Sequence, residues 1–366
     1  MENKWNYGID LLRVVAMFMI CVLHTLLQGG VMTHCDFGGV VNWGQYYMCY
    51  ALEILTFVCV DIYALISGYV GYRSKFKISK IINYLIIVLF YTLSITLIFQ
   101  IAYPSEITKN QWLNAIQPIM RKQYWYMTAY FALLMISPIL NAGIENMNKR
   151  VGYVTLILMY AVFALIPSLL RIDPFALGAG YSFVWLTLLY IAGGIFKKFE
   201  VFKNIHFYFG LIVYFSTCLI EYILVVNHIK GYLSYRSFLT VLGAVGLLQT
   251  FSKINIKRAK TQTVVRIMGE ASLAVYLIHV HPLIWNKFMK NYGFKSKFTE
   301  TTQIAPVFFK ILLGALSIYL ICTAIELIRM GLFKLIRYKK VLKGLDTTFE
   351  KWVLTEKKGN NLDGAK

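Results

Sequence analysis

Long apolar stretches alternate with short polar segments along nearly the whole chain. Each stretch has about the length that a helix needs to cross a bilayer, roughly 20 residues for a hydrocarbon core of about 30 Å. We place ten of them, at residues 8–28, 47–70, 81–103, 124–142, 152–170, 181–196, 207–226, 233–251, 268–286 and 305–328. The pattern therefore predicts an all-α polytopic membrane protein with about ten transmembrane helices.

The composition agrees with this pattern. Hydrophobic residues make up 58% of the 366 residues, against roughly 45–50% in ordinary soluble domains. No Pro/Gly-rich linker divides the chain, so we expect one membrane domain at residues 1–335. Residues 336–366 form a basic cytoplasmic tail, which is too short for a folded domain and is expected to end as an amphipathic or disordered segment at the inner membrane surface.

The basic residues fall mainly between the apolar stretches. With the N-terminus in the cytoplasm, 25 of the 37 Lys and Arg residues lie on the cytoplasmic side and 10 on the opposite side. The positive-inside rule then predicts that both termini are cytoplasmic in a multi-pass protein of the cell membrane. Topology and contact with anionic lipids explain the net charge of +20, so no nucleic-acid partner is expected.

The first apolar stretch carries the ionisable residues Asp10, Arg13 and His24. Asp10 and Arg13 have the spacing of a helical ion pair. Arg13 and His24 would lie on one side of the helix, about 20° apart in angle and about 16 Å apart in height. A guanidinium near the cytoplasm suits an anion, and an imidazole suits proton transfer. Alternatively, Arg13 extends to the interface and His24 bonds a neighbouring carbonyl group.

Three residues of the second stretch are candidates for structural support. Asp61 lies near the middle of the membrane, where a carboxylate needs either a basic partner or a water in a cavity, and it fits a structural ion pair or a catalytic role. Ser67 and Gly68 are small enough for neighbouring helices to approach closely.

Aromatic and imidazole groups mark the outer half of the membrane. Trp125 and Tyr126 suit either an interfacial aromatic belt or stacking against a sugar. His279 is expected at the depth of His24, which favours a polar cavity there. The six cysteines form no C-x-x-C pair and show no spacing typical of metal ligands, so no metal site is expected.

Four motifs in order resemble the acyltransferase family 3 membrane proteins. They are Ile9-Asp10-Leu11-Leu12-Arg13 followed by His24, then Leu65-Ile66-Ser67-Gly68-Tyr69, then Trp125-Tyr126-Met127 with Tyr130 and Ser137-Pro138, and finally Ser272 with Tyr276-Leu277-Ile278-His279. This resemblance covers essentially the whole chain. It implies an enzyme that transfers groups other than amino-acyl groups, moving an acyl group, usually acetyl, from cytoplasmic acyl-CoA to hydroxyls of surface polysaccharides or lipid-linked sugars.

The resemblance also implies site residues. Arg13 and His24 match the residues that the family requires. The family often has a second basic motif with paired arginines after the second helix, and here Arg73 stands closest to it, with Lys77 and Lys80 at the paired spacing. Arg13 and these three residues are therefore expected to bind the donor acyl-CoA, and no permanently bound cofactor is expected. Trp125, Tyr126 and His279 would line the acceptor end.

In the predicted mechanism, the pantetheine arm of acyl-CoA extends from the cytoplasmic basic residues towards His24. His24 then acts as general base on an acceptor hydroxyl, or it carries the acyl group covalently. A transporter or flippase for a glycan or small acid is the alternative function, because many helices with charges near the midplane also describe secondary carriers. A membrane sensor is a third possibility.

The distribution of basic residues makes the topology testable. Reporter fusions after Lys77 and Lys257 should give cytoplasmic signals, and fusions after Cys35 and Lys295 should give external signals. The reverse signals would place His24 in the inner half of the membrane, contrary to this prediction.

Overall fold

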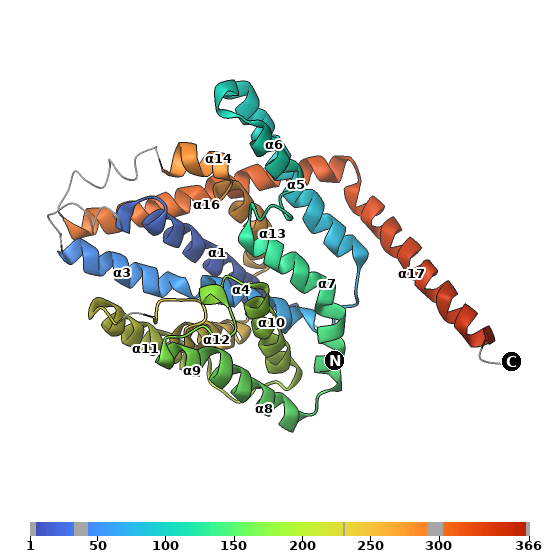
Figure 1. The fold of residues 1–366 in the computed structure, drawn as a ribbon, viewed down its shortest axis with the longest axis horizontal. Helices are drawn as coiled ribbons and strands as arrows, with labels where there is room; N and C mark the ends of the chain where they lie inside the picture. Colours follow the sequence, from blue (N-terminus) through green and yellow to red (C-terminus); the bar gives the residue numbers. More distant parts are fainter. Residues whose placement is uncertain (1–4, 33–42, 230, 291–302, 364–366) are drawn as a thin grey trace.

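The computed structural model describes residues 5–32, 43–229, 231–290 and 303–363, and the side chains as far as residue 351. Within these residues the chain forms helices and no strand (Figure 1). The α-helices are α1 (Tyr7–Leu27), α3 (Trp43–Phe57), α4 (Cys59–Gly71), α5 (Ile78–Ala102), α6 (Lys109–Ile116), α7 (Trp125–Asn146), α8 (Lys149–Tyr160), α9 (Ile166–Leu170), α10 (Phe183–Lys198), α11 (Phe207–Val226), α12 (Phe238–Ser252), α13 (Ala259–His279), α14 (Pro282–Ile284), α16 (Ile304–Leu335) and α17 (Tyr338–Asp363).

The predicted all-helical membrane fold is confirmed, but the predicted number of ten spans is not. Among the described residues, seven helical segments are long and apolar enough to cross a membrane, and the bent pair 259–279 and 282–289 brings the number to eight. Helices α10 and α12 contain 16 and 15 residues, which correspond to only about 24 and 22 Å of helix. The orientation of the two termini stays a prediction.

Turns shift the start of α10 by two residues without shortening it, and they shorten α12 relative to its apolar stretch. The Ser182 hydroxyl accepts a hydrogen bond from the Trp185 amide and so fixes the start of α10. Before α12, the Ser237 amide donates to the Ser234 carbonyl in a turn. Aromatic residues that precede these points extend the apolar pattern without extending the helices.

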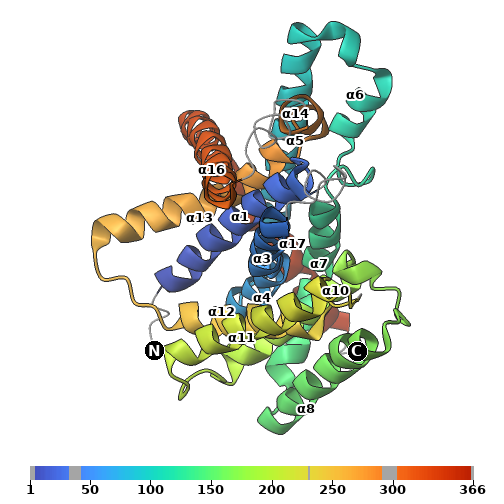
Figure 2. The same ribbon diagram turned by 90° about the vertical axis from the view of Figure 1, so that its left-hand side faces the viewer.

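Helix α1 is central to the bundle, where it packs against α3, α4, α13 and α16. Figure 2 shows α1 and α3 in the interior, with α11 and α8 on one side and α6 projecting at the opposite end. Helix α17 leads away from α16 past the start of α5 and contacts both helices (Figure 1). The site described below lies between α1, α4, α5, α7, α13 and α16.

Glycines bring α4 and α10 into backbone contact. A Cβ atom on Gly68 would lie 1.8 Å from the carbonyl oxygen of Tyr190, and one on Gly193 would lie 2.1 Å from that of Leu65. Because dispersion contacts between backbones hold membrane helices together, this close approach stabilises the pair. It fixes α4, whose other face lines the site described below.

Replacing Gly68 by Ala should therefore destabilise the protein. The added methyl group must push α4 and α10 apart, at a cost of about 1–3 kcal/mol. Thermal unfolding of the purified protein in detergent measures this loss. The matched control is Gly143→Ala in α7, where a Cβ meets nothing within 4 Å, and equal unfolding temperatures for the two variants would contradict the contact.

Candidate functional site

A cavity of about 1430 Å³ lies within the helical bundle. His24 and Trp285 line it at one end, and Arg13 lines it about three helical turns further along the same face of α1. The cavity continues to a group of basic side chains from α5, α16, α17 and the turn between α16 and α17, namely Lys80, Arg329, Lys334, Arg337, Lys339 and Lys340. One continuous space thus connects an imidazole to a basic surface.

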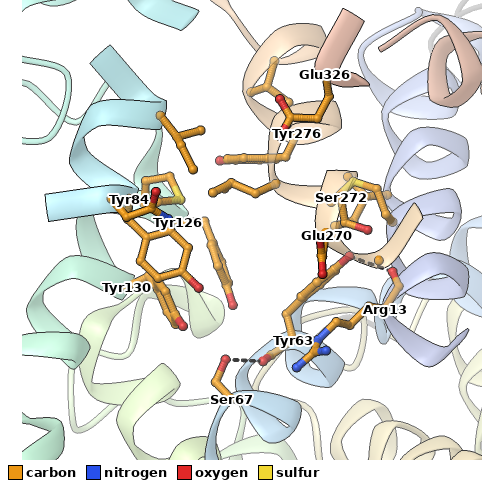
Figure 3. A pocket seen from close by; sticks show the side chains of 18 of the residues that line it. Arg13, Tyr63, Ser67, Tyr84, Tyr126, Tyr130, Glu270, Ser272, Tyr276 and Glu326 are labelled. Atoms are coloured by element: carbon orange, nitrogen blue, oxygen red, sulfur yellow. Dashed lines mark hydrogen bonds between the residues drawn. The ribbon is translucent and has the colours of Figure 1, made fainter. Parts of the chain in front are cut away.

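Arg13 is held by Asp10 and Tyr63. Its guanidinium forms an ion pair with Asp10, as the spacing of the two residues predicts. Asp10 is buried and also accepts a hydrogen bond of 2.6 Å from the Trp5 indole. The Tyr63 hydroxyl donates to the Arg13 carbonyl at 2.7 Å (Figure 3). The guanidinium is 27% exposed and has further N–H donors for an anion in the cavity.

His24 and His279 form a hydrogen-bonded pair that joins α1 to α13. The Nδ1 atom of His24 lies 2.9 Å from Nε2 of His279, and Nδ1 of His279 contacts the Val275 carbonyl oxygen. A carbonyl can only accept, so Nδ1 of His279 carries the proton and its Nε2, in a neutral ring, is an acceptor. His24 must then donate from Nδ1, which leaves the lone pair of its Nε2 available. His24 is thereby arranged as a proton acceptor.

Tyrosine hydroxyls line the middle of the cavity. Tyr84, Tyr126 and Tyr130 lie on one side, facing Tyr63 and Arg13 across the open space (Figure 3). Tyr126 stacks on Tyr130 with ring centroids 6.0 Å apart, and Tyr84 meets Tyr130 edge-on at 5.6 Å. Such a lining offers hydrogen bonds without charge, which suits a neutral polar chain or a sugar.

Trp125 belongs to an aromatic cluster on the wall of the cavity. Its ring centroid lies 4.7 Å from that of Tyr181, which in turn lies 4.9 Å from Tyr235. The predicted substrate-binding residues Trp125 and Tyr126 both line the cavity. The third, His279, is buried and reaches the site through His24.

The structure separates the predicted donor-binding residues. Lys80 lines the cavity together with Arg13. Arg73 and Lys77 are exposed on the segment between α4 and α5, and neither belongs to the described lining. The Arg73 guanidinium instead lies over the Tyr72 ring, 5.4 Å from its centroid.

The predicted support residues occupy different faces of α4. Ser67 lines the cavity and donates to the Tyr63 carbonyl at 2.8 Å, whereas Gly68 contacts α10. Asp61 is fully buried away from the cavity and accepts a hydrogen bond of 3.0 Å from the Trp185 indole. An indole thus contacts this carboxyl group, where the sequence allowed a basic partner or a catalytic role.

Sequence reasoning missed a second acid–arginine pair on α16. Arg329 donates from two nitrogens to the two carboxylate oxygens of Glu326, at 2.7 and 2.6 Å. Both residues are buried and line the cavity, and the Tyr91 hydroxyl also bonds Glu326. The sequence does contain a signal for this ion pair, because Glu326 and Arg329 have the same i, i+3 spacing as Asp10 and Arg13.

Comparison with protein families identifies the class. The model of acyltransferase family 3, described as an acyltransferase domain, matches residues 6–326. The chain therefore belongs to this family, and the predicted resemblance is confirmed. It is a multi-pass membrane acyltransferase. No curated protein and no solved structure matches this chain.

Proposed function

We propose that the protein transfers an acyl group, in the simplest case acetyl, from cytoplasmic acyl-CoA to a hydroxyl of a cell-surface polysaccharide or lipid-linked sugar. The observation that supports this proposal is the single cavity that connects the basic surface to Nε2 of His24. Each end suits one part of the donor. Phosphates pair with guanidinium and ammonium groups, and a thioester needs a nearby base that activates its attacker.

The donor enters from the basic end. Its phosphates pair with Lys80 and neighbouring cations, while its neutral pantetheine arm extends past the tyrosines. The rise of α1 between Arg13 and His24, about 16 Å, is of the order of the reach of that arm. The thioester then lies beside His24. Arg73 and Lys77 are outside the cavity, and we assign no donor contact to them.

The mechanism of acyl transfer follows from which ring nitrogens of His24 and His279 carry protons. Nε2 of His24 takes the proton of the acceptor hydroxyl as its oxygen attacks the thioester carbonyl. The new C–O bond forms, the C–S bond breaks, and the CoA thiolate leaves with the proton from His24. His279 stabilises the transient imidazolium by accepting from Nδ1. In the covalent variant, Nε2 attacks the thioester carbonyl, the C–S bond breaks and the CoA thiolate leaves. The acceptor oxygen then attacks the acyl group on Nε2, the C–N bond breaks, and the hydroxyl proton passes to the thiolate.

A sugar acceptor suits the aromatic wall. Trp125 and Tyr126 offer ring faces to a pyranose, and tyrosine hydroxyls offer hydrogen bonds. The acceptor reaches His24 from the side opposite to the donor, since the donor occupies the basic end. Transport of a glycan is the competing function, and the assay below distinguishes the two.

We expect membranes containing the protein to move label from acetyl-CoA to added surface glycan as a base-labile ester. The cavity provides both the donor surface and the base for this reaction. Chromatography of the glycan, before and after mild alkali, measures the ester. If the glycan crosses the vesicle membrane without gaining acetyl esters, the protein is a transporter and the proposal is overturned.

Variants of His24 and Arg13 should fail in different ways. His24→Ala removes the proton acceptor and should lower turnover by about 10²–10⁴-fold, while acetyl-CoA binding persists. Arg13→Ala should instead weaken acetyl-CoA binding, and Arg13→Lys should retain part of it because the charge stays and the planar fork is lost.

Binding and ester formation are measured separately on equal amounts of purified protein. The matched control is His206→Ala, since His206 is exposed on the segment before α11 and does not line the cavity. Near-normal ester formation by His24→Ala would remove His24 from the catalytic role.

A further inference from the structure

The C-terminal helix begins at the edge of the cavity. Helix α16 ends at Leu335, and Arg337 adopts a left-handed conformation with φ of 52° that redirects the chain. Helix α17 follows at Tyr338. This turn places Arg337, Lys339 and Lys340 in the lining of the cavity, although all three belong to the basic tail of the sequence.

These side chains concentrate positive charge in a small region. Arg337, Lys339 and Lys340 share the cavity edge with Lys80 and Lys334. Like charges at close range repel one another, and a bound polyanion relieves the repulsion. Arg329 nearby is already paired with Glu326. The unpaired positive field at this edge therefore comes largely from α17 and the last turn of α16.

A second contact fixes the position of α17. Lys77 provides no side-chain cap for α5. Instead, Asp346 accepts hydrogen bonds from the Ser79 amide at 3.1 Å and from the Ser79 hydroxyl at 2.6 Å. A carboxylate is favourable at the N-terminus of a helix. Phe349, one turn further, packs near Phe76 with ring centroids 6.0 Å apart.

We propose that α17 forms one wall of the donor site, with Arg337, Lys339 and Lys340 binding the phosphates of acyl-CoA and Asp346 acting as the positioning residue that holds the helix against α5. This inference rests on the proposed function. It assigns donor recognition to a segment beyond residue 326, where the family match ends.

The first test compares two donors. Lys339→Ala with Lys340→Ala should weaken acetyl-CoA binding about tenfold. Acetyl transfer from S-acetylpantetheine, which lacks the nucleotide and its phosphates, should stay within twofold of the unaltered protein. The matched control is Lys343→Ala with Lys351→Ala, which removes the same two charges from exposed positions on α17 that do not line the cavity.

The second test uses the sign of an electrostatic effect. Removing an acid near a phosphate site strengthens anion binding if charge alone acts. If Asp346 positions α17, Asp346→Ala should instead weaken acetyl-CoA binding several-fold. Glu350→Ala removes the same charge one turn further along an exposed face of α17 and should not weaken binding.

All measurements use the full chain in lipid nanodiscs, with acetyl-CoA titrated by equilibrium binding and folding checked by thermal unfolding. If the unaltered protein binds no acetyl-CoA, the proposed function fails and this inference fails with it. If the unaltered protein binds acetyl-CoA and the lysine double variant binds it equally well, only the role of α17 is overturned. Equal losses with acetyl-CoA and S-acetylpantetheine would also overturn that role.

Discussion

A charge within a helical membrane bundle needs a partner, and this requirement organises the cavity. Two acid–arginine pairs satisfy this requirement, each within a single helix. They are Asp10 with Arg13 on α1 and Glu326 with Arg329 on α16. Because each pair forms inside one helix, neighbouring helices need not close around it to neutralise the charge. A wide space can therefore open beside α1 and α16, towards α5 and α7. The rest of its middle section is lined by tyrosine hydroxyls, which are polar but uncharged, and by the carboxyl group of Glu270 (Figure 3).

The two faces of α4 show how such a space coexists with a stable bundle. One face presents Tyr63 and Ser67 to the cavity, while Gly68 on the other face meets the backbone of α10. Helices α11 and α12 make a similar contact, where a Cβ on Gly210 would lie 2.1 Å from the Gly246 carbonyl oxygen. Close backbone packing on one side thus compensates for the contacts that the open side lacks.

Features that depend on local residue spacing could be predicted from the sequence, and contacts between distant segments could not. The helical fold, the family and the Asp10 and Arg13 pair follow from patterns within one helix or from ordered motifs. The starting residue of α10 and the length of α12 do not, because apolar residues in a turn look like apolar residues in a helix. Trp185 lies 124 residues from Asp61, so no local rule connects them. In the sequence, the basic residues of the tail indicate only topology and lipid contact, since it is the turn at Arg337 that brings them to the cavity.

The bond between His279 and the Val275 carbonyl spans a single turn at the very end of α13, just before the chain bends by 61°. The tautomer of His279, and through it the basicity of His24, is thus set by the integrity of this last turn. Helix ends fray more readily than helix interiors. If the turn opened, His279 would lose its acceptor and could exchange its ring proton, and His24 would no longer be held with its free lone pair in the cavity. In the proposed mechanism, catalytic activity is therefore coupled to a local helix–coil equilibrium, and any contact that stabilises the bend after His279 also affects the proposed base, His24.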